Sequence, residues 1–149
     1  MTIQLILKQM RIIVVMVSIF SLLFSCSDKE EPIGKWDDII KLSEKEVDFL
    51  AATDSVIITT QGTWWWVQSI SLNGKSYLYY DTAGIDLESD NYTIEEAEFT
   101  VERRDATTLF VKMNANTSNK MRVLDITLEA GNYFDRVCIR QAADASLNK

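Results

Sequence analysis

The sequence has 149 residues, with 15 basic and 22 acidic side chains, no histidine and a formal net charge of −7. An acidic chain repels phosphate backbones, so we expect no nucleic-acid partner. The absence of histidine excludes the usual nucleophile triads and removes the commonest ligand of zinc and copper, so we expect no catalytic residue, metal or cofactor.

The first 25 residues have the features of a cleaved export signal. Two basic residues, Lys8 and Arg11, precede an apolar segment that continues to residue 24. That segment is shorter than the ~20 apolar residues that span a bilayer. Its removal leaves residues 26–149, which have the size of one domain. The net charge then falls from −7 to −9, because both basic residues are lost and every acid lies after residue 25.

The residues that end the signal are Leu23, Phe24, Ser25 and Cys26. This order resembles the lipobox of bacterial lipoproteins, in which a small residue directly precedes an obligatory cysteine. The resemblance implies that Cys26 carries acyl chains that hold the protein on a membrane. The charged residues 27–31 resemble the tag that sends lipoproteins of Bacteroidetes to the outer face of the outer membrane. A solvated tether would explain the same composition.

The composition changes again after the cysteine. Residues 26–42 are charged and contain the only proline, which favours a flexible tether. Apolar residues alternate from there on, so we expect one domain over 43–142 and a C-terminal tail over 143–149. Cys138 has no disulfide partner once Cys26 is acylated, and we expect it to be a half-buried strand thiol.

The alternation predicts about seven to eight short strands. Apolar side chains occupy every second position, turn residues separate the segments, and only 94–97 could form a helical turn. The expected strands are 47–49, 56–60, 64–72, 75–80, 99–102, 109–113, 124–128 and 137–140. This all-β pattern is typical of an antiparallel, immunoglobulin-like β-sandwich.

One hairpin can be predicted in detail. Asn73 and Gly74 stand between two β-rich segments and predict a two-residue turn that pairs Ile70 with Tyr77. One face then collects Trp64, Trp66, Ile70, Leu72, Tyr77 and Tyr79, and the other collects Trp65, Val67, Leu78 and Tyr80. We expect the first face to form the core because its apolar area is larger. A bulge near the tryptophans would shift this assignment by one residue.

The last third of the chain carries a further resemblance. It has an Asn-Ala-Asn-Thr-Ser turn at 114–118, a strand that starts at Arg122, a glycine turn at Gly131 and a last strand that closes on Gln141. Other matching residues are Ile126, Leu128, Asp135, Val137, Ile139 and Arg140. The pattern resembles the closing strands of the BACON-type domains of Bacteroidetes, and a looser match extends over 43–142. The resemblance implies an immunoglobulin-like sandwich associated with glycan-handling machinery, for which carbohydrate or mucin binding is proposed.

Aromatic side chains are the candidate ligand-binding residues. A sugar stacks its C–H face on an exposed planar ring, and polar groups beside the ring bind its hydroxyls. The candidates are Trp65 and Tyr80 on the face expected to be exposed, and Trp64, Trp66, Tyr77 and Tyr79 on the other. We therefore expect a non-catalytic binding module for glycans or host glycoproteins, anchored in the outer membrane and facing the cell surface.

Two alternatives to this hypothesis have different consequences. The protein could be a structural or accessory lipoprotein, acting as a spacer or binding a protein partner through a sheet edge. It could also be a glycosidase, which needs two carboxylates in one groove. The nearby acids Glu95, Glu96 and Glu98 alternate faces or are solvated in an extended chain, so they do not favour catalysis.

Overall fold

The computed structural model describes residues 37–77 and 84–148. They belong to one compact unit, Trp36–Lys149. The predictions for the export signal, for Cys26 and for the side chains of Tyr79 and Tyr80 therefore lie outside the described residues. Within the described ranges, no helix has the length and apolar composition needed to cross a bilayer.

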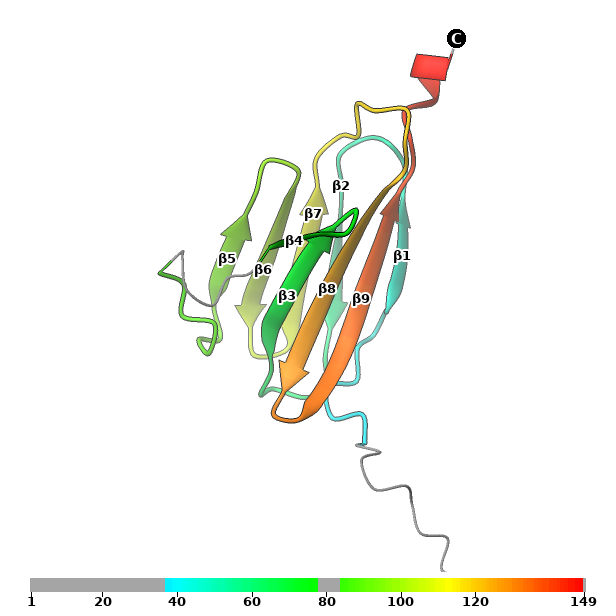
Figure 1. Ribbon diagram of the computed structural model, residues 1–149. Helices are drawn as coiled ribbons and strands as arrows, with labels where there is room; N and C mark the ends of the chain where they lie inside the picture. The colour runs from blue at the N-terminus through cyan, green and yellow to red at the C-terminus, as the bar shows by residue number, and fades with distance from the viewer. Residues whose placement is uncertain (1–36, 78–83, 149) are drawn as a thin grey trace, which may run out of the picture. The chain divides into compact units, whose positions relative to one another are not determined.

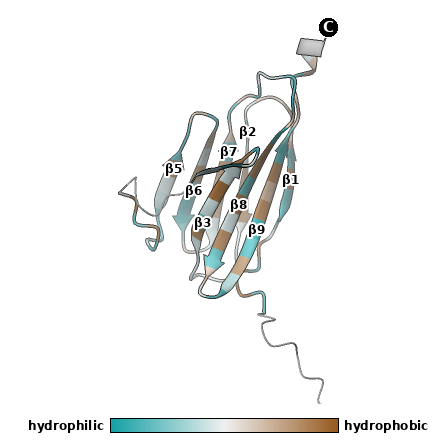
Figure 2. Cartoon of the chain, viewed as in Figure 1, coloured by the Kyte–Doolittle hydropathy of each residue, from teal (hydrophilic) through white to brown (hydrophobic). Residues whose placement is uncertain are grey.

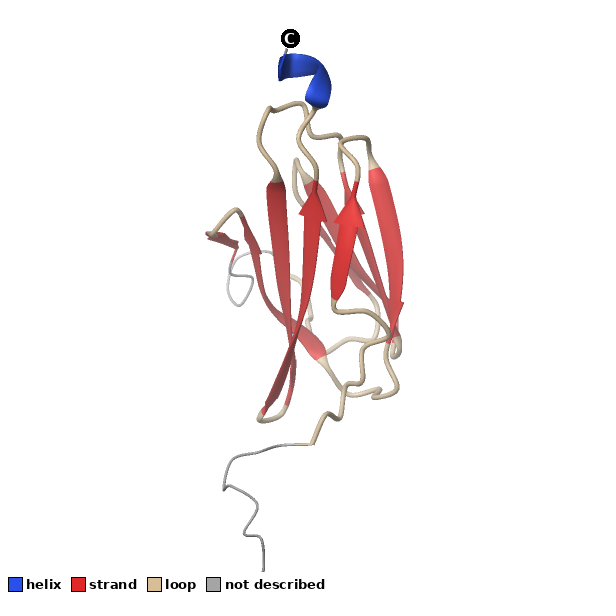
Figure 3. Cartoon of the chain, turned by 90° about the vertical axis from the view of Figure 1, so that its right-hand side faces the viewer, coloured by secondary structure: helices blue, strands red, loops and turns tan. Residues whose placement is uncertain are grey.

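Two sheets pack face to face and enclose the core (Figures 1 and 3). The first sheet has five strands in the order β1-β9-β8-β3-β4, and the second has four in the order β2-β7-β6-β5. The strands of the first sheet are β1 (Glu46–Phe49), β9 (Tyr133–Gln141), β8 (Arg122–Ala130), β3 (Trp66–Leu72) and β4 (Lys75–Tyr77). Those of the second are β2 (Asp54–Thr59), β7 (Thr108–Met113), β6 (Phe99–Asp105) and β5 (Tyr92–Glu95). A single 3-10 turn, Ala145–Asn148, follows β9.

The all-β sandwich predicted from the alternation is confirmed. The sheets β9-β8-β3 and β2-β7-β6 reproduce the order in which immunoglobulin strands pair. Two details differ from the expectation. The first strand, β1, pairs with β9 in parallel, whereas the other pairs are antiparallel. Residues 94 and 95 belong to the additional strand β5 and do not form a helical turn.

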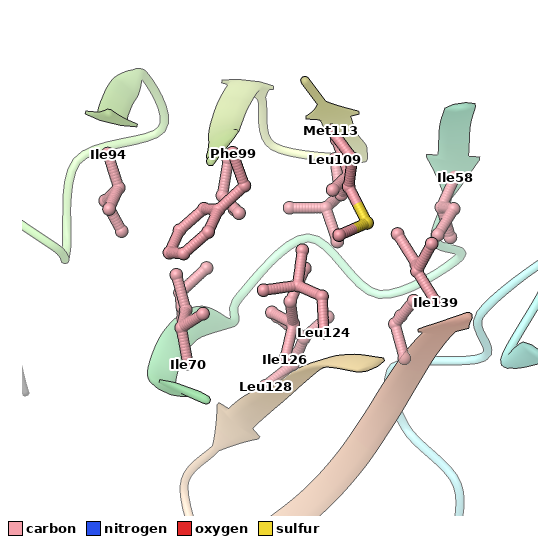
Figure 4. Packing of buried hydrophobic residues seen from close by; sticks show 14 of the residues in the cluster. Ile58, Ile70, Ile94, Phe99, Leu109, Met113, Leu124, Ile126, Leu128 and Ile139 are labelled. Carbon is pink, nitrogen blue, oxygen red and sulfur yellow. The ribbon is translucent and has the colours of Figure 1, made fainter. Parts of the chain in front are cut away.

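Strict alternation places the core between the sheets. In β8, buried Leu124, Ile126 and Leu128 alternate with half-buried polar residues, and Figure 2 shows the resulting bands of hydropathy along the strands. Figure 4 shows these leucine and isoleucine side chains pointing toward Phe99 and Leu109 of the opposite sheet. Each fully buried side chain of this kind stabilises the fold by about 1.5 to 3 kcal/mol.

The chain joins the sandwich earlier than expected. Ile40 is fully buried in the core, and its carbonyl oxygen accepts hydrogen bonds from the amides of Gln61 (3.0 Å) and Gly62 (3.1 Å). A Cβ atom at Gly62 would lie 2.2 Å from the carbonyl oxygen of Ile39, so this contact requires glycine. The end of the stretch 26–42 is therefore part of the domain. One buried residue among charged ones leaves no periodic signal, which is why the sequence pattern missed it.

Several of the residues that carry the BACON-type resemblance form one buried polar network. The Nε2 atom of buried Gln141 donates to the carbonyl oxygens of Ala52 (3.0 Å) and Asn114 (3.2 Å). Its Oε1 atom accepts two hydrogen bonds from Arg122, at 3.1 and 2.5 Å. Buried side-chain amides need such partners, because an unsatisfied one costs about 1 to 3 kcal/mol. Gln141 therefore joins β9, β8 and the segment after β7.

Asn116 plays the same part in the neighbouring turn. Its Nδ2 atom donates to the carbonyl oxygens of Lys120 (2.8 Å) and Ala142 (2.9 Å). Its Oδ1 atom accepts from the amide (3.1 Å) and the hydroxyl (2.7 Å) of Ser118. The Asn-Thr-Ser sequence thus builds a turn that is tied to the chain leaving β9.

Candidate functional site

The predicted hairpin turn is present. Asn73 and Gly74 have φ angles of 52° and 79°, and Ile70 pairs with Tyr77 as expected. Both residues adopt the positive φ that a type I′ turn requires, and asparagine and glycine do so most readily. The local chemistry of two residues therefore sets the register of β3 and β4.

A β-bulge then changes which tryptophan faces the core. The pairing of β3 with β8 shifts between Val67 and Ser69, so that Gln68 is an extra residue in the ladder. Such a bulge reverses the facing of every residue beyond it. Residues on the turn side of the bulge keep the expected facing, and those on the other side are inverted.

The tryptophan assignment predicted from the sequence is therefore wrong. Trp65, expected on the exposed face, is 1% exposed, and Val67 beside it is also buried. Trp64, expected in the core, is 71% exposed, and Trp66 is half-buried. The predictions for Ile70 and Leu72, which lie on the turn side of the bulge, are confirmed. Trp65 is consequently inaccessible as a stacking surface.

Trp65 is fixed in the interior by polar contacts. Its indole Nε1 donates to the Oγ1 atom of Thr60 (3.0 Å), and that hydroxyl donates in turn to the carbonyl oxygen of Gly62 (2.6 Å). The guanidinium carbon of Arg103 lies 4.5 Å from the centre of the indole ring. A buried tryptophan with a satisfied N–H and a cation on its face has little freedom to leave the core.

Arg103 is the residue that the sequence pattern gave no reason to select. It is only 2% exposed, and its Nη2 atom contacts the carbonyl oxygen of Thr63 (2.9 Å) and a carboxylate oxygen of Asp90 (3.0 Å). Its Nη1 atom donates to the carbonyl oxygen of Ser89 (2.9 Å). Arg103 therefore connects the segment around Trp65 to the segment that precedes β5.

The bulge itself is stabilised by a distant side chain. The amide of Val67 donates to the hydroxyl of Tyr92, which lies in β5, at 2.9 Å. Tyr92 is buried, and its desolvation raises the pKa of the hydroxyl. The neutral phenol of Tyr92 therefore accepts the hydrogen bond of the Val67 amide in place of a backbone carbonyl oxygen of the sheet. No local motif signals this contact.

Three aromatic side chains form an accessible surface, which we call the aromatic platform: Trp64, Trp66 and Phe134. The rings of Trp64 and Trp66 are 5.5 Å apart and meet edge to face at 77°. Glu129 of β8 pairs with Trp66 on one side and with Phe134 on the other, so Trp66 and Phe134 lie on the outer face of the sheet. Phe134 is 53% exposed. The sequence predicted Trp64 and Trp66 as candidate residues and missed Phe134.

The turn between β8 and β9 supports Trp64. Gly131 has a φ of 62°, and a Cβ atom there would lie 3.6 Å from the indole ring of Trp64. The residues on either side, Ala130 and Asn132, line an open groove of about 330 Å³ together with Asp37, Ile39 and Tyr133. The aromatic platform therefore adjoins a shallow groove with both apolar and polar lining.

Tyr77, another of the predicted aromatic candidates, does not join the platform. Tyr77 is half-buried, its ring meets Phe99 edge to face at 5.3 Å, and the Nζ atom of Lys75 lies 4.8 Å from its centre. Tyr77 therefore packs against the core. Tyr79 and Tyr80 lie outside the described residues.

Metal and thiol chemistry have no site in the described part of the chain. No three histidine, cysteine, aspartate or glutamate side chains there could hold a metal ion together. Cys138 lies in β9 and is buried, without a disulfide, and burial together with nearby Asp125 raises the pKa of its thiol. A protonated, buried thiol is a poor nucleophile.

The comparisons with known proteins support the fold. No family model matches the sequence, and no curated protein matches it. Among solved structures, the chain is similar to the "NMR structure of the protein from Bacteroides thetaiotaomicron". The TM-score is 0.60 at 23% sequence identity, and the alignment covers 77% of this chain and 95% of that one. The chain therefore has a β-sandwich fold resembling that of a Bacteroides protein.

Proposed function

We propose that this protein is a non-catalytic binding module for glycans or host glycoproteins, anchored by Cys26 in the outer membrane and facing the cell surface. The observation that carries the proposal is the aromatic platform, where the 71% exposed Trp64 stands beside Trp66 on an outer sheet face. Clustered exposed aromatic rings are a feature of binding surfaces rather than of inert ones.

The surroundings of the platform suit a sugar ligand. Tryptophan and phenylalanine rings offer apolar faces to the C–H groups of a pyranose ring. Glu129 lies between Trp66 and Phe134, and Asn132 lines the adjoining groove. These side chains place hydrogen-bonding groups for hydroxyls at the edges of the rings.

The platform also has a rigid support, as a binding site requires. Trp64 lies between Thr63, whose carbonyl oxygen binds Arg103, and Trp65, which is fixed in the core. A Cβ atom at Gly131 would lie 3.6 Å from the indole ring of Trp64, so the turn packs close to the ring. Because these contacts precede ligand binding, little conformational entropy is lost when a ligand arrives.

The assignment to the BACON-type domains belongs to this proposal. It is supported by the hydrogen bonds between Gln141 and Arg122 and by those of Asn116 in the neighbouring turn, which give a structural reason for these residues of the resemblance. The likeness to a Bacteroides fold agrees with it. The lipobox-like residues before Cys26 support the membrane anchor.

A glycan array and a melting experiment test the binding function. We expect Trp64→Ala to lower the affinity for the bound glycan at least tenfold, which corresponds to about 1.4 kcal/mol, with a nearly unchanged melting temperature. Ile57→Ala is the matched control, because Ile57 is 55% exposed on the other sheet. It should bind as the wild type does.

Two results would contradict the proposal. The wild-type domain could bind no glycan on the array, or Trp64→Ala could bind as well as Ile57→Ala. Either result would favour the alternative role of a spacer or of a sandwich that binds a protein partner.

A further inference from the structure

The outer face of the first sheet continues beyond the aromatic platform as rows of polar side chains. The row next to the platform consists of Ser69, Thr127 and Arg136, which pair across β3, β8 and β9. The row after it contains Ser71 and Asp125, and buried Cys138 of β9 lies beside Asp125 in the same row. We call the five serine, threonine and charged residues of these two rows the polar strip. Their side chains are half-buried or exposed, so they are accessible from solvent.

The spacing of the rows gives the length of the surface. Side chains on one face of a strand recur every second residue, or about every 7 Å. From Glu129 in the platform row to Asp125, the face therefore extends over about 14 Å along β8. This length exceeds one pyranose ring, so a single sugar on the platform would leave the polar strip unoccupied.

The acidic composition of the domain selects against anionic ligands. The central strand β8 contributes two carboxylates to it, Asp125 and Glu129. Arg136 is the cation of the strip, and its Nε atom lies 3.5 Å from the Oδ1 atom of Asp125, so their charges compensate. A sulfate, sialate or uronate group would be repelled by the domain as a whole, because residues 26–149 have a net charge of −9.

We infer that the outer face of β3, β8 and β9 binds an extended, unbranched, neutral saccharide chain that runs along the strands. One ring stacks on the aromatic platform, and the following rings place their hydroxyls on the serine, threonine and charged side chains of the polar strip. This inference rests on the proposed function and specifies its ligand class.

Calorimetry with linear neutral oligosaccharides tests the inference. The probes are β-glucan, β-xylan, β-mannan and α-glucan series, each from monomer to hexamer. We expect the affinity of the preferred series to rise at least tenfold from the monomer to the tetramer and then to level off, because the face is filled.

A steric variant locates the added contacts. Thr127→Arg should reduce the affinity for the tetramer at least to that of the wild type for the monomer. Thr100→Arg is the matched control, because Thr100 is a half-buried threonine in β6 of the other sheet. It should not change the affinity for either probe. Ser71→Arg provides a second blocking variant in case Thr127→Arg does not fold.

The outcomes separate the inference from the proposed function. If affinity does not depend on chain length, or if folded Thr127→Arg and Ser71→Arg bind the tetramer normally, the inference is wrong while glycan binding by the platform stands. Tighter binding of polygalacturonate or heparin fragments would also overturn it. If no saccharide binds to the wild-type protein, both the inference and the proposed function fail.

Discussion

Buried Arg103 contacts the residues on either side of Trp64, although Arg103 itself is not part of the aromatic platform. Its guanidinium group contacts two carbonyl oxygens, the carboxylate of Asp90 and the face of Trp65. Burying a charge is costly unless such partners replace water. Through Thr63 and Trp65, the residues on either side of Trp64, Arg103 keeps the exposed indole at a defined position.

Removal of this cation should destabilise the domain strongly. We expect Arg103→Met to lower the free energy of unfolding by about 3 to 5 kcal/mol, because it leaves buried carbonyl oxygens without donors. Arg104→Met, in the same strand, removes an ion pair to Glu102 that is accessible to solvent and should cost about 1 kcal/mol or less. Urea denaturation of the two variants measures both values. Equal losses would contradict the structural role given to Arg103.

Tyr133 gives the domain a specific sensitivity to alkaline pH. Burial, with the nearby charges of Asp135 and Asp38, raises the pKa of its hydroxyl from 10.0 to about 12. Between these two values the unfolded chain has released the proton and the folded chain still holds it, so stability falls as the pH rises. Below pH 10 this contribution is fully present.

A conservative variant isolates the effect. We expect the free energy of unfolding of Tyr133→Phe to decrease less steeply than that of the wild type between pH 10 and pH 12, because phenylalanine has no proton to lose. Urea denaturation at several pH values across this interval gives the two slopes. Identical slopes would show that the pKa of Tyr133 is the same in the folded and unfolded chains.

At the scale of the strand, β8 is the element whose alternation is clearest. Ile126 is fully buried and pairs with Ile70 and Val137, whereas its neighbour Thr127 faces outward. The same strand therefore contributes side chains to the core and to the polar strip. If the facing of β8 were shifted by one residue, Ile126 would point outward and Thr127 would point into the core.

Two substitutions in β8 check this facing. Ile126→Ala should lower the free energy of unfolding by about 2 to 5 kcal/mol through the lost burial and the cavity that remains. Thr127→Ala should stay within about 0.5 kcal/mol of the wild type, as surface substitutions do. Thermal or urea unfolding distinguishes the two. Comparable losses at both positions would mean that Thr127 also packs in the interior.

The strands differ in how far the sequence predicts them. The register of β3 and β4 follows from Asn73 and Gly74, because a local backbone requirement decides it. The bulge at Gln68 depends on the hydroxyl of Tyr92, which is remote in the sequence and belongs to a strand that the alternation did not reveal. Patterns of neighbouring residues predict the first kind of feature and miss the second. The tryptophan facing was therefore predicted incorrectly although the hairpin was predicted correctly.

For the whole domain, composition and alternation were sufficient to predict the class of fold, since a sandwich needs little more than alternating strands and turns. The two ends of the β8–β9 hairpin have different roles. Arg122 and Gln141 pair at one end, where the buried polar network joins both sheets. Gly131 and the aromatic platform lie at the other. The buried polar network and the aromatic platform therefore lie at separate ends of one long hairpin, so substitutions in one should leave the other largely unaffected.

The proposed membrane anchor at Cys26 lies outside the described residues. If the proposed export signal is removed, the remaining chain has a net charge of −9, which anionic lipid head groups would repel. Acyl chains on Cys26 would supply the attachment that electrostatics opposes. We expect Cys26→Ala to move the protein from the membrane fraction to the soluble fraction of fractionated cells, while the melting temperature of the domain stays unchanged. Retention of Cys26→Ala in the membrane fraction would show that another part of the chain, or a partner, holds the protein there.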